Sequence, residues 1–181
     1  MKKEILYVHG YNSSGGTGRA LEAMLAPKGY RVHHFSIPQR ADEAIARVKE
    51  YLNEHTDIKL VVGSSLGGIV TLQQTGHCKL VINPCLHPSE VLPKIGAEDD
   101  IAQSYLPYEE RLTEICTSEE RVLTYSMFST DDELLNYSGE FATLYGNEQM
   151  SSIPQGKHSL SDEQLHDYVI PQILHIIERE V

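Results

Sequence analysis

The pentapeptide Gly63-Ser64-Ser65-Leu66-Gly67 carries the clearest signal for chemistry in this chain. It follows the apolar run Leu60–Val62 and precedes a segment with helical patterning, so a sharp strand-to-helix turn is expected there. Such a turn is so tight that the second residue before and the second residue after its central serine cannot carry a side chain. The turn also raises the serine hydroxyl above the edge of the sheet. The following helix directs its positive end at charge developing on an attacked carbonyl oxygen. The pattern predicts that Ser65 is a nucleophile.

The alternative without catalytic function is a glycine-rich turn in which the serine caps a helix. The strand and helix patterns on either side of the turn disfavour this alternative. A second glycine-rich loop, residues 9–16, follows the strand pattern Ile5–Val8. Enzymes with this kind of nucleophile hold the oxyanion with two backbone N–H groups, one after the nucleophile and one from an early loop. Leu66 and Tyr11 are the matching positions. A phosphate-binding loop is excluded, since no Gly-Lys-Ser/Thr follows and the Gly-x-Gly-x-x-Gly spacing is absent.

A serine hydroxyl needs a histidine to take its proton and a carboxylate to orient that histidine. In enzymes with this turn the chain order is serine, acid, histidine. Of nine histidines, His158 has both this order and a loop context, Gly156-Lys157-His158-Ser159. The acid is expected after the strand pattern Arg121–Ser129, where Asp131, Asp132 and Glu133 are adjacent. Their spacing alone does not choose between them.

The elements that must position these residues alternate between short apolar runs and helical patterns. This order predicts an α/β protein with three layers, α/β/α, around a mostly parallel sheet. We expect strands at Ile5–Val8, Tyr30–Ser36, Leu60–Val62, Lys79–Asn83, Arg121–Ser129 and Gln149–Ile153. Helices are expected at Arg19–Lys28, at Ala41–His55 and from Gly68 to about Thr75. The capping-box pattern Ser161-x-x-Gln164 predicts a final helix, with a kink or restart at Pro171.

Residues 86–120 contain three prolines and no strand pattern, and we expect them to form a cap excursion above the sheet of a single domain, 1–181. The segment has nine acidic residues against two basic ones, and thus seven of the chain's eleven net negative charges. Its position after the fourth strand predicts that this charge surrounds the mouth of the substrate pocket. The alternative is a solvated acidic loop.

Composition narrows the class of protein further. The 181 residues are 40% hydrophobic and 23% charged, with a net charge of −11, which argues against nucleic-acid binding. No apolar run approaches the roughly 18 to 20 residues of a membrane span, and Ile5–His9 is too short for a signal-peptide core, so we expect a cytoplasmic protein. Cys78, Cys85 and Cys116 form no Cys-x-x-Cys pair, and we expect neither disulfides nor a zinc site.

With these residues placed, the sequence resembles the YqiA-like esterase family, small single-domain α/β hydrolases of bacteria. The matching segments run in order from residue 5 to about 160: Leu6-Tyr7-Val8-His9-Gly10-Tyr11-Asn12-Ser13-Ser14, Gly63-Ser64-Ser65-Leu66-Gly67-Gly68, Val81-Ile82-Asn83-Pro84, Thr130-Asp131-Asp132-Glu133 and Gly156-Lys157-His158. The resemblance implies a minimal α/β-hydrolase fold with a short cap segment, and a triad of Ser65, Asp132 and His158. The family pattern in the acid loop is Thr-Gly-Asp-Glu, so Asp131 replaces a glycine and stays an alternative acid.

The resemblance also implies the activity, which is hydrolysis of small-molecule acyl esters with no metal and no organic cofactor. An acyl-thioester hydrolase is the close alternative, because the same triad and oxyanion hole serve both leaving groups. A binding protein that keeps the fold without catalysis is the alternative from another class.

Overall fold

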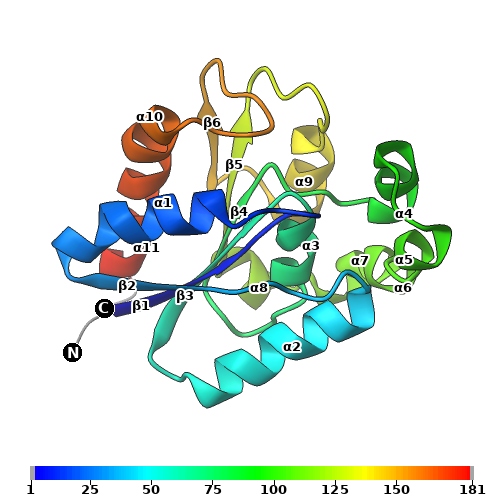
Figure 1. Cartoon of the computed structure of the whole chain (residues 1–181), viewed down its shortest axis with the longest axis horizontal. Coiled ribbons are helices and arrows are strands. Elements are labelled where there is room, and N and C mark those ends of the chain that lie inside the picture. Colours follow the sequence, from blue (N-terminus) through cyan, green and yellow to red (C-terminus); the bar gives the residue numbers. More distant parts are fainter. Residues whose placement is uncertain (1–2, 180–181) are drawn as a thin grey trace.

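The computed structural model describes residues 3–179, which form one six-stranded sheet in the order β2-β1-β3-β4-β5-β6, with every neighbouring pair parallel (Figure 1). The strands are β1 (Lys3–Val8), β2 (Tyr30–His34), β3 (Ile58–Ser64), β4 (Lys79–Ile82), β5 (Thr124–Ser129) and β6 (Met150–Ile153). Because all strands run the same way, their carboxyl ends meet along one edge. The expected α/β class with a mostly parallel sheet is confirmed.

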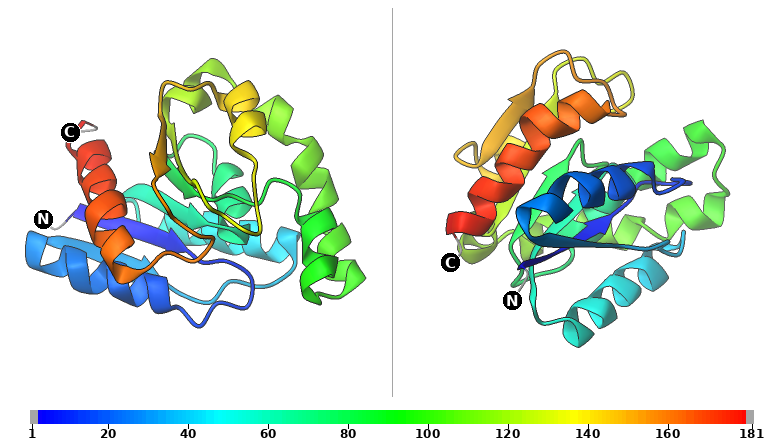
Figure 2. Two further views of the ribbon diagram at one scale, coloured as in Figure 1. Left: turned by 90° about the horizontal axis from the view of Figure 1, so that it is seen from above. Right: turned by 60° about the vertical axis from the view of Figure 1, so that its left-hand side comes forward.

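Helices cover both faces of the sheet, which gives the expected three layers (Figure 2). Alternate residues of each strand point to opposite faces. On β1, Ile5 and Tyr7 pack with α1 (Gly16–Leu25) and α11 (Ile170–Arg179), whereas Leu6 and Val8 pack with α2 (Ala41–Glu54) and α3 (Leu66–Leu72). The sheet therefore lies between two separate apolar clusters.

Several predicted boundaries differ from the structure by one or more residues. The strand expected at Arg121–Ser129 begins only at Thr124, because residues 118–122 form α8 (Ser118–Val122). The Thr117 side chain accepts the N–H of Glu120 and so caps this helix, and acidic residues in its first turn favour it further. The strand expected to reach Ser36 ends at His34, and the helix expected to reach Lys28 ends in a 3₁₀ turn, η1 (Ala26–Lys28). A helix that was not predicted, α9 (Ser138–Tyr145), follows the acid loop.

The segment after β4 is a chain of short helices beside α2 and α3 (Figure 1). They are α4 (Pro88–Val91), η2 (Leu92–Ile95), α5 (Asp99–Gln103), α6 (Leu106–Glu110) and α7 (Leu112–Ile115). Buried Leu92, Ala102 and Tyr105 join the apolar cluster of α2 and α3, and Tyr105 Oη donates to the carbonyl of Gln39 at 3.0 Å. The segment is thus anchored at the side of the domain, next to the carboxyl edge of the sheet.

The C-terminal helix begins and restarts where the sequence indicated. Ser161 and Gln164 form the reciprocal capping box at the start of α10 (Asp162–Gln164). A π-helical turn, η3 (Leu165–Val169), follows, and α11 begins at Ile170 with Pro171 in its first turn. A proline has no N–H to donate, so the α-helical pattern has to begin anew there. None of the helices within residues 3–179 is long and apolar enough to cross a membrane.

Candidate active site

Ser65 lies between β3 and α3 in a strained backbone conformation, with φ 52° and ψ −122°. Residues other than glycine pay for a positive φ, and such strain persists only where surrounding contacts fix it. Here the Ser65 N–H donates to the Ile82 carbonyl at 3.1 Å, and the Ser65 carbonyl accepts from the N–H groups of Gly68 and Cys85, both at 2.9 Å. The turn is therefore pinned from the neighbouring strand and from its own helix.

The two glycines that flank Ser65 are required by close approach. A methyl group on Gly63 would overlap the carbonyl oxygen of Gly67 and the side chain of Thr71. A methyl group on Gly67 would overlap the carbonyl oxygens of Val8 and His9 at the end of β1. These neighbours are backbone or buried groups that cannot move aside, so Gly63 is required by the packing of β3 against α3, and Gly67 by the packing of the turn against the end of β1.

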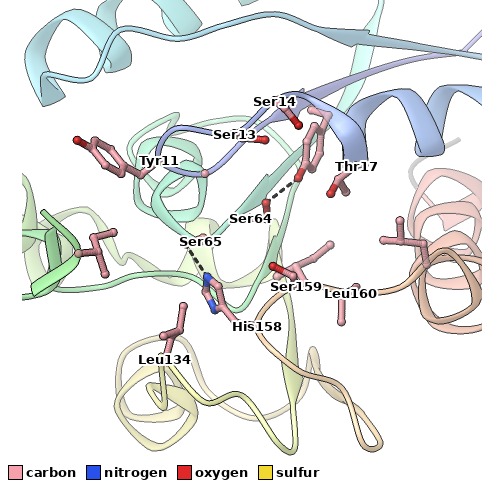
Figure 3. A pocket seen from close by; sticks show the side chains of 15 residues that line it. Tyr11, Ser13, Ser14, Thr17, Ser64, Ser65, Leu134, His158, Ser159 and Leu160 are labelled. Atoms are coloured by element: carbon pink, nitrogen blue, oxygen red, sulfur yellow. Dashed lines mark hydrogen bonds between the residues drawn. The ribbon is translucent and has the colours of Figure 1, made fainter. Parts of the chain in front are cut away.

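Hydrogen bonds connect the side chains of Ser65, His158 and Asp132 in a row, and Figure 3 shows the link between Ser65 and His158. His158 Nε2 lies 3.0 Å from Ser65 Oγ, and His158 Nδ1 lies 2.9 Å from Asp132 Oδ2. A carboxylate only accepts, so the imidazole proton sits on Nδ1 and leaves Nε2 to accept the serine hydroxyl. Ser65 and His158 are 93 residues apart along the chain, and Asp132 and His158 are 26 residues apart.

The acid loop aims one of its three carboxylates at His158. Asp132 Oδ1 accepts the N–H groups of Leu134 and Leu135, each at 2.8 Å. Burial alone would raise the pKa of Asp132, but the hydrogen bonds from His158 and from these two N–H groups hold that pKa below its ordinary value. The Asp132 carboxylate is thus ionised at neutral pH and fixed at both oxygens.

The neighbouring carboxylates are directed elsewhere. Asp131 is exposed, and among residues 3–179 its carboxylate accepts only from the adjacent Thr130 hydroxyl, at 3.2 Å. Its backbone N–H donates to the Gly156 carbonyl at 2.9 Å, which ties the acid loop to the histidine loop. Glu133 accepts the backbone N–H of His158 at 3.1 Å. An aspartate at the glycine position of the family pattern therefore leaves the turn able to present Asp132.

The two positions expected to form the oxyanion hole flank Ser65. Neither the Tyr11 nor the Leu66 N–H has a hydrogen-bond partner among residues 3–179. The loop that carries Tyr11 passes close by, since a Cβ on Gly10 would lie 3.1 Å from Ser65 Cβ. Leu66 opens α3, where N–H groups have no partner within the helix.

His9 holds the oxyanion loop in place. Its buried ring donates from Nδ1 to the Gly10 carbonyl at 2.7 Å and accepts the Ile37 N–H at Nε2, at 3.3 Å. Both ring nitrogens are thus occupied by backbone groups, which makes His9 a neutral structural residue and leaves it no proton-accepting site for Ser65.

Asn83 is a site residue to which the sequence assigned no role. It follows β4 with φ 44° and is buried. Its Nδ2 donates to Ser129 Oγ at 2.8 Å and approaches the carbonyls of Lys157 and His158 at 3.4 and 3.5 Å, while its Oδ1 accepts the Ser129 N–H at 2.7 Å. Asn83 thus joins the strand end before the acid loop to the histidine loop. The available signal was an asparagine directly after a buried strand, a residue type that tolerates positive φ.

The nearest cysteine does not compete with Ser65 as a nucleophile. Cys85 is buried beside the turn, and burial raises the pKa of its thiol to about 12, so the thiol stays protonated at neutral pH. Cys78 is also buried, and Cys116 donates to the Leu144 carbonyl at 2.9 Å.

A cavity of about 370 Å³ opens over Ser65 and His158. Its size lies within the range of small-molecule sites, at the lower end. Its lining combines apolar side chains with several hydroxyls, and the residues are Tyr7, Gly10, Tyr11, Ser13, Ser14, Thr17, Ser64, Ser65, Ile82, Ile95, Leu134, His158, Ser159, Leu160 and Leu165.

The expectation that the acidic segment 86–120 surrounds this pocket with charge is wrong, because its one lining residue is Ile95. Several of its carboxylates have partners elsewhere. Glu120 pairs with buried Lys79, Glu109 accepts from Ser89, and Asp100 pairs with Arg40 at 3.2 Å. These carboxylates cap the short helices or form ion pairs that attach them to the rest of the domain. Their negative charge therefore does not line the cavity.

Solved structures with the same architecture include proteins named as lipases and a thioesterase domain. Est1E from Butyrivibrio proteoclasticus superposes with a TM-score of 0.70 at 13% identity, covering 96% of this chain and 90% of its own. A monoacylglycerol lipase from Paleococcus ferrophilus gives 0.73 at 15% identity, with 98% and 95% covered. A thioesterase domain from the curacin biosynthetic pathway gives 0.62 at 12% identity, with 98% and 91% covered. At these identities the likeness shows the fold, which is that of the α/β hydrolases.

Sequence comparison gives a family match over most of the chain. The model of an uncharacterised protein family, UPF0227, matches residues 4–177. No curated protein matches the chain significantly.

Proposed function

The chain belongs to the uncharacterised protein family UPF0227, and we propose that it is a serine hydrolase that cleaves carboxylic esters through an acyl-enzyme. The resemblance to YqiA-like esterases is to this same family. The observation that carries the proposal is the row of hydrogen bonds from Ser65 through His158 to Asp132. A nucleophile, a base and an orienting acid in hydrogen-bond contact meet the geometric requirement for activated serine chemistry.

In the proposed first half-reaction, Ser65 Oγ attacks the ester carbonyl carbon while His158 Nε2 accepts the hydroxyl proton. The negative charge that forms on the carbonyl oxygen is stabilised by the free N–H groups of Tyr11 and Leu66. His158 then gives its proton to the departing alcohol oxygen, and the carbonyl reforms as an acyl ester of Ser65. Asp132 stabilises the His158 imidazolium from the moment it forms until it gives its proton to the alcohol, and it keeps the other imidazole proton on Nδ1 of His158.

In the second half-reaction a water molecule takes the place of the alcohol. His158 Nε2 removes a proton from this water as its oxygen attacks the acyl carbon, and returns the proton to Ser65 Oγ as the carboxylic acid leaves. The strained conformation of Ser65 supports this role, because it presents the hydroxyl at the carboxyl edge of the sheet.

The test is labelling by a fluorophosphonate probe, with the modified residue located by mass spectrometry. Ser65 should be labelled, Ser65→Ala should not be, and His158→Ala should react at least about a hundredfold more slowly because the hydroxyl is no longer activated. The matched control is His175→Ala, which removes an exposed histidine of α11 and should react like the wild type. A wild-type protein that fails to react would favour the alternative of a non-catalytic binding protein.

Comparing kcat/KM for 4-nitrophenyl butyrate with kcat/KM for the butyryl thioester of coenzyme A distinguishes an ester hydrolase from an acyl-thioester hydrolase. An ester hydrolase should have the higher kcat/KM on the oxygen ester. The reverse preference would move the assignment to an acyl-thioester hydrolase.

A further inference from the structure

The cavity over Ser65 has two unlike sides. Figure 3 shows Ser13, Ser14, Thr17, Ser64 and Ser159 on one side of the Ser65–His158 pair, with Leu134 and Tyr11 on the other. The lining also includes Tyr7, whose hydroxyl reaches Ser64 Oγ at 2.7 Å, and Ile95 from the segment after β4. We define the hydroxyl lobe as Tyr7, Ser13, Ser14, Thr17, Ser64 and Ser159.

The hydroxyl lobe is built into the scaffold of the site. Tyr7 lies on β1 and Ser64 ends β3, two paired strands of the sheet, and Thr17 lies in the first turn of α1. Tyr7 is almost completely buried, and this burial raises the pKa of its phenol more than the contacts with Ser64 and Thr17 lower it. The phenol therefore stays neutral, so the lobe presents a fixed hydroxyl pair one residue from the nucleophile.

The chemistry of the lobe selects an uncharged hydroxylated ligand. A hydroxyl both donates and accepts, so it pairs with another hydroxyl in either direction. Among the described residues that line the cavity there is no lysine, arginine, aspartate or glutamate. Neither an anionic nor a cationic group of a ligand would find an opposite charge there. Leu160, beside Ser159, provides apolar contact for the carbon skeleton that bears the hydroxyls.

Two apolar side chains of the cavity lining are not covered by the protein. Ile95 is 50% exposed and Leu134 is 57% exposed, and both line the cavity from different segments of the chain. An apolar chain placed against them would remove their surface from water, which favours binding. The two sides together match an ester with one apolar half and one hydroxylated half.

We propose that the substrate is a short-chain ester of a polyol, with its hydroxylated alcohol half in the hydroxyl lobe and its acyl chain against Ile95 and Leu134. The orientation follows from ester chemistry, because a polyol keeps its remaining hydroxyls on the alcohol half. The inference rests on the proposed ester hydrolysis at Ser65. It adds the class of the leaving alcohol, which the triad alone does not determine.

The first experiment compares kcat/KM for glyceryl 1-monobutyrate and propyl butyrate, which share an acyl chain and differ by two hydroxyls. Each neutral hydrogen bond is worth about two- to twelvefold, so with two hydroxyls the wild type should prefer the glyceryl ester at least about fourfold. Thr17→Val and Tyr7→Phe keep the side-chain shapes and should each lower this ratio by about threefold or more. Thr75→Val, which alters an exposed threonine outside the cavity, should keep it. Equal rates on both esters, or preference for the butyryl thioester of coenzyme A over both, would overturn the proposal.

The second experiment does not depend on hydrolysis. The ether 1-O-butylglycerol has the same hydroxyls as the glyceryl ester and cannot be cleaved. It should bind wild-type and Ser65→Ala protein more tightly than butyl propyl ether, and Thr17→Val should remove most of the difference. If the ether binds in this way but Ser65 does not react with a fluorophosphonate, the proposed hydrolysis fails and the polyol site stands. If Ser65 reacts but the two ethers bind equally, the hydrolase stands and the polyol site fails.

Discussion

Asn83 and Ser129 exchange two hydrogen bonds across the ends of β4 and β5, with Asn83 Nδ2 donating to Ser129 Oγ at 2.8 Å and Asn83 Oδ1 accepting the Ser129 N–H at 2.7 Å. Ser129 is the last residue before the acid loop, and Asn83 Nδ2 also approaches the carbonyl of His158. One buried amide thus positions the segments that carry the acid and the base.

Asn83→Ala should therefore lower kcat by about tenfold or more with little change in KM, because a small displacement of the base affects the transition state more than binding. The loss of a buried hydrogen-bonding partner and the positive φ should also lower the free energy of unfolding by about 2–4 kcal/mol. Ser129→Ala keeps the N–H bond and removes only the hydroxyl, so its effects should be smaller. A positioning role is contradicted if Asn83→Ala loses stability while kcat stays at the wild-type value.

The acid assignment is tested by comparing two neighbouring amides. In Asp132→Asn, the new NH₂ group faces His158 Nδ1, so the imidazole has to carry its proton on Nε2 and can no longer accept from Ser65. We expect kcat to fall by about four orders of magnitude. Asp131 is an exposed carboxylate, so in Asp131→Asn we expect kcat to fall by less than about threefold. The opposite ranking in ester turnover would assign the acid to Asp131.

Asp132 also determines part of the response of stability to acid. Its pKa in the folded chain lies below the ordinary 3.8, because the hydrogen bonds to its carboxylate outweigh burial. Such a group stabilises the fold fully above its unfolded pKa, and this contribution is lost as the pH falls through the folded pKa. The difference in free energy of unfolding between the wild type and Asp132→Asn should therefore shrink as the pH falls below about pH 4. Urea unfolding at several pH values measures it, with Asp131→Asn as the control.

The site was predictable from the sequence wherever a local rule ties residue type to position. Gly67 is needed because the β1 backbone lies against the turn, and Gly63 because Gly67 and Thr71 of α3 lie against it. The order of Ser65, Asp132 and His158 along the chain follows the order of the parallel strands. Apolar runs predicted β1, β3 and β4, because buried parallel strands leave little choice of residue.

What escaped prediction depends on contacts between distant segments. Arg121 and Val122 have strand-like neighbours, yet they lie in α8, which brings Glu120 to Lys79. The role of Asn83 needs the ends of β4, β5 and the histidine loop to meet in space. The placement of the acidic segment depends on which carboxylates find partners, and composition does not contain that information.

The ion pair of Lys79 and Glu120 should affect stability without affecting catalysis. Lys79 is fully buried, and its Nζ donates to the Glu120 carboxylate and to the carbonyls of Gln74 and His77 at 3.2 and 3.1 Å. Glu120→Ala would leave this ammonium without a countercharge, so the free energy of unfolding should fall by about 3–5 kcal/mol. Glu119→Ala removes an exposed carboxylate from the first turn of the same helix and should lower it much less. Urea unfolding measures both, and at a temperature where both variants are folded their kcat should equal that of the wild type.

Ile95 is expected to set the preference for acyl chain length. Its side chain lines the cavity, is half exposed and belongs to η2, which is distant in sequence from all three triad residues. Ile95→Ser removes apolar surface from the side where we place the acyl chain, and each buried methylene of the substrate is worth about 0.8 kcal/mol, or about fourfold in kcat/KM. Across 4-nitrophenyl esters from acetate to octanoate, the variant should match the wild type on acetate and fall about fivefold or more on the longer chains. Leu106→Ser alters a similarly exposed leucine of the same segment that does not line the cavity, and its chain-length profile should be unchanged. A uniform loss on all esters, or the same profile in both variants, would show that Ile95 does not contact the acyl chain.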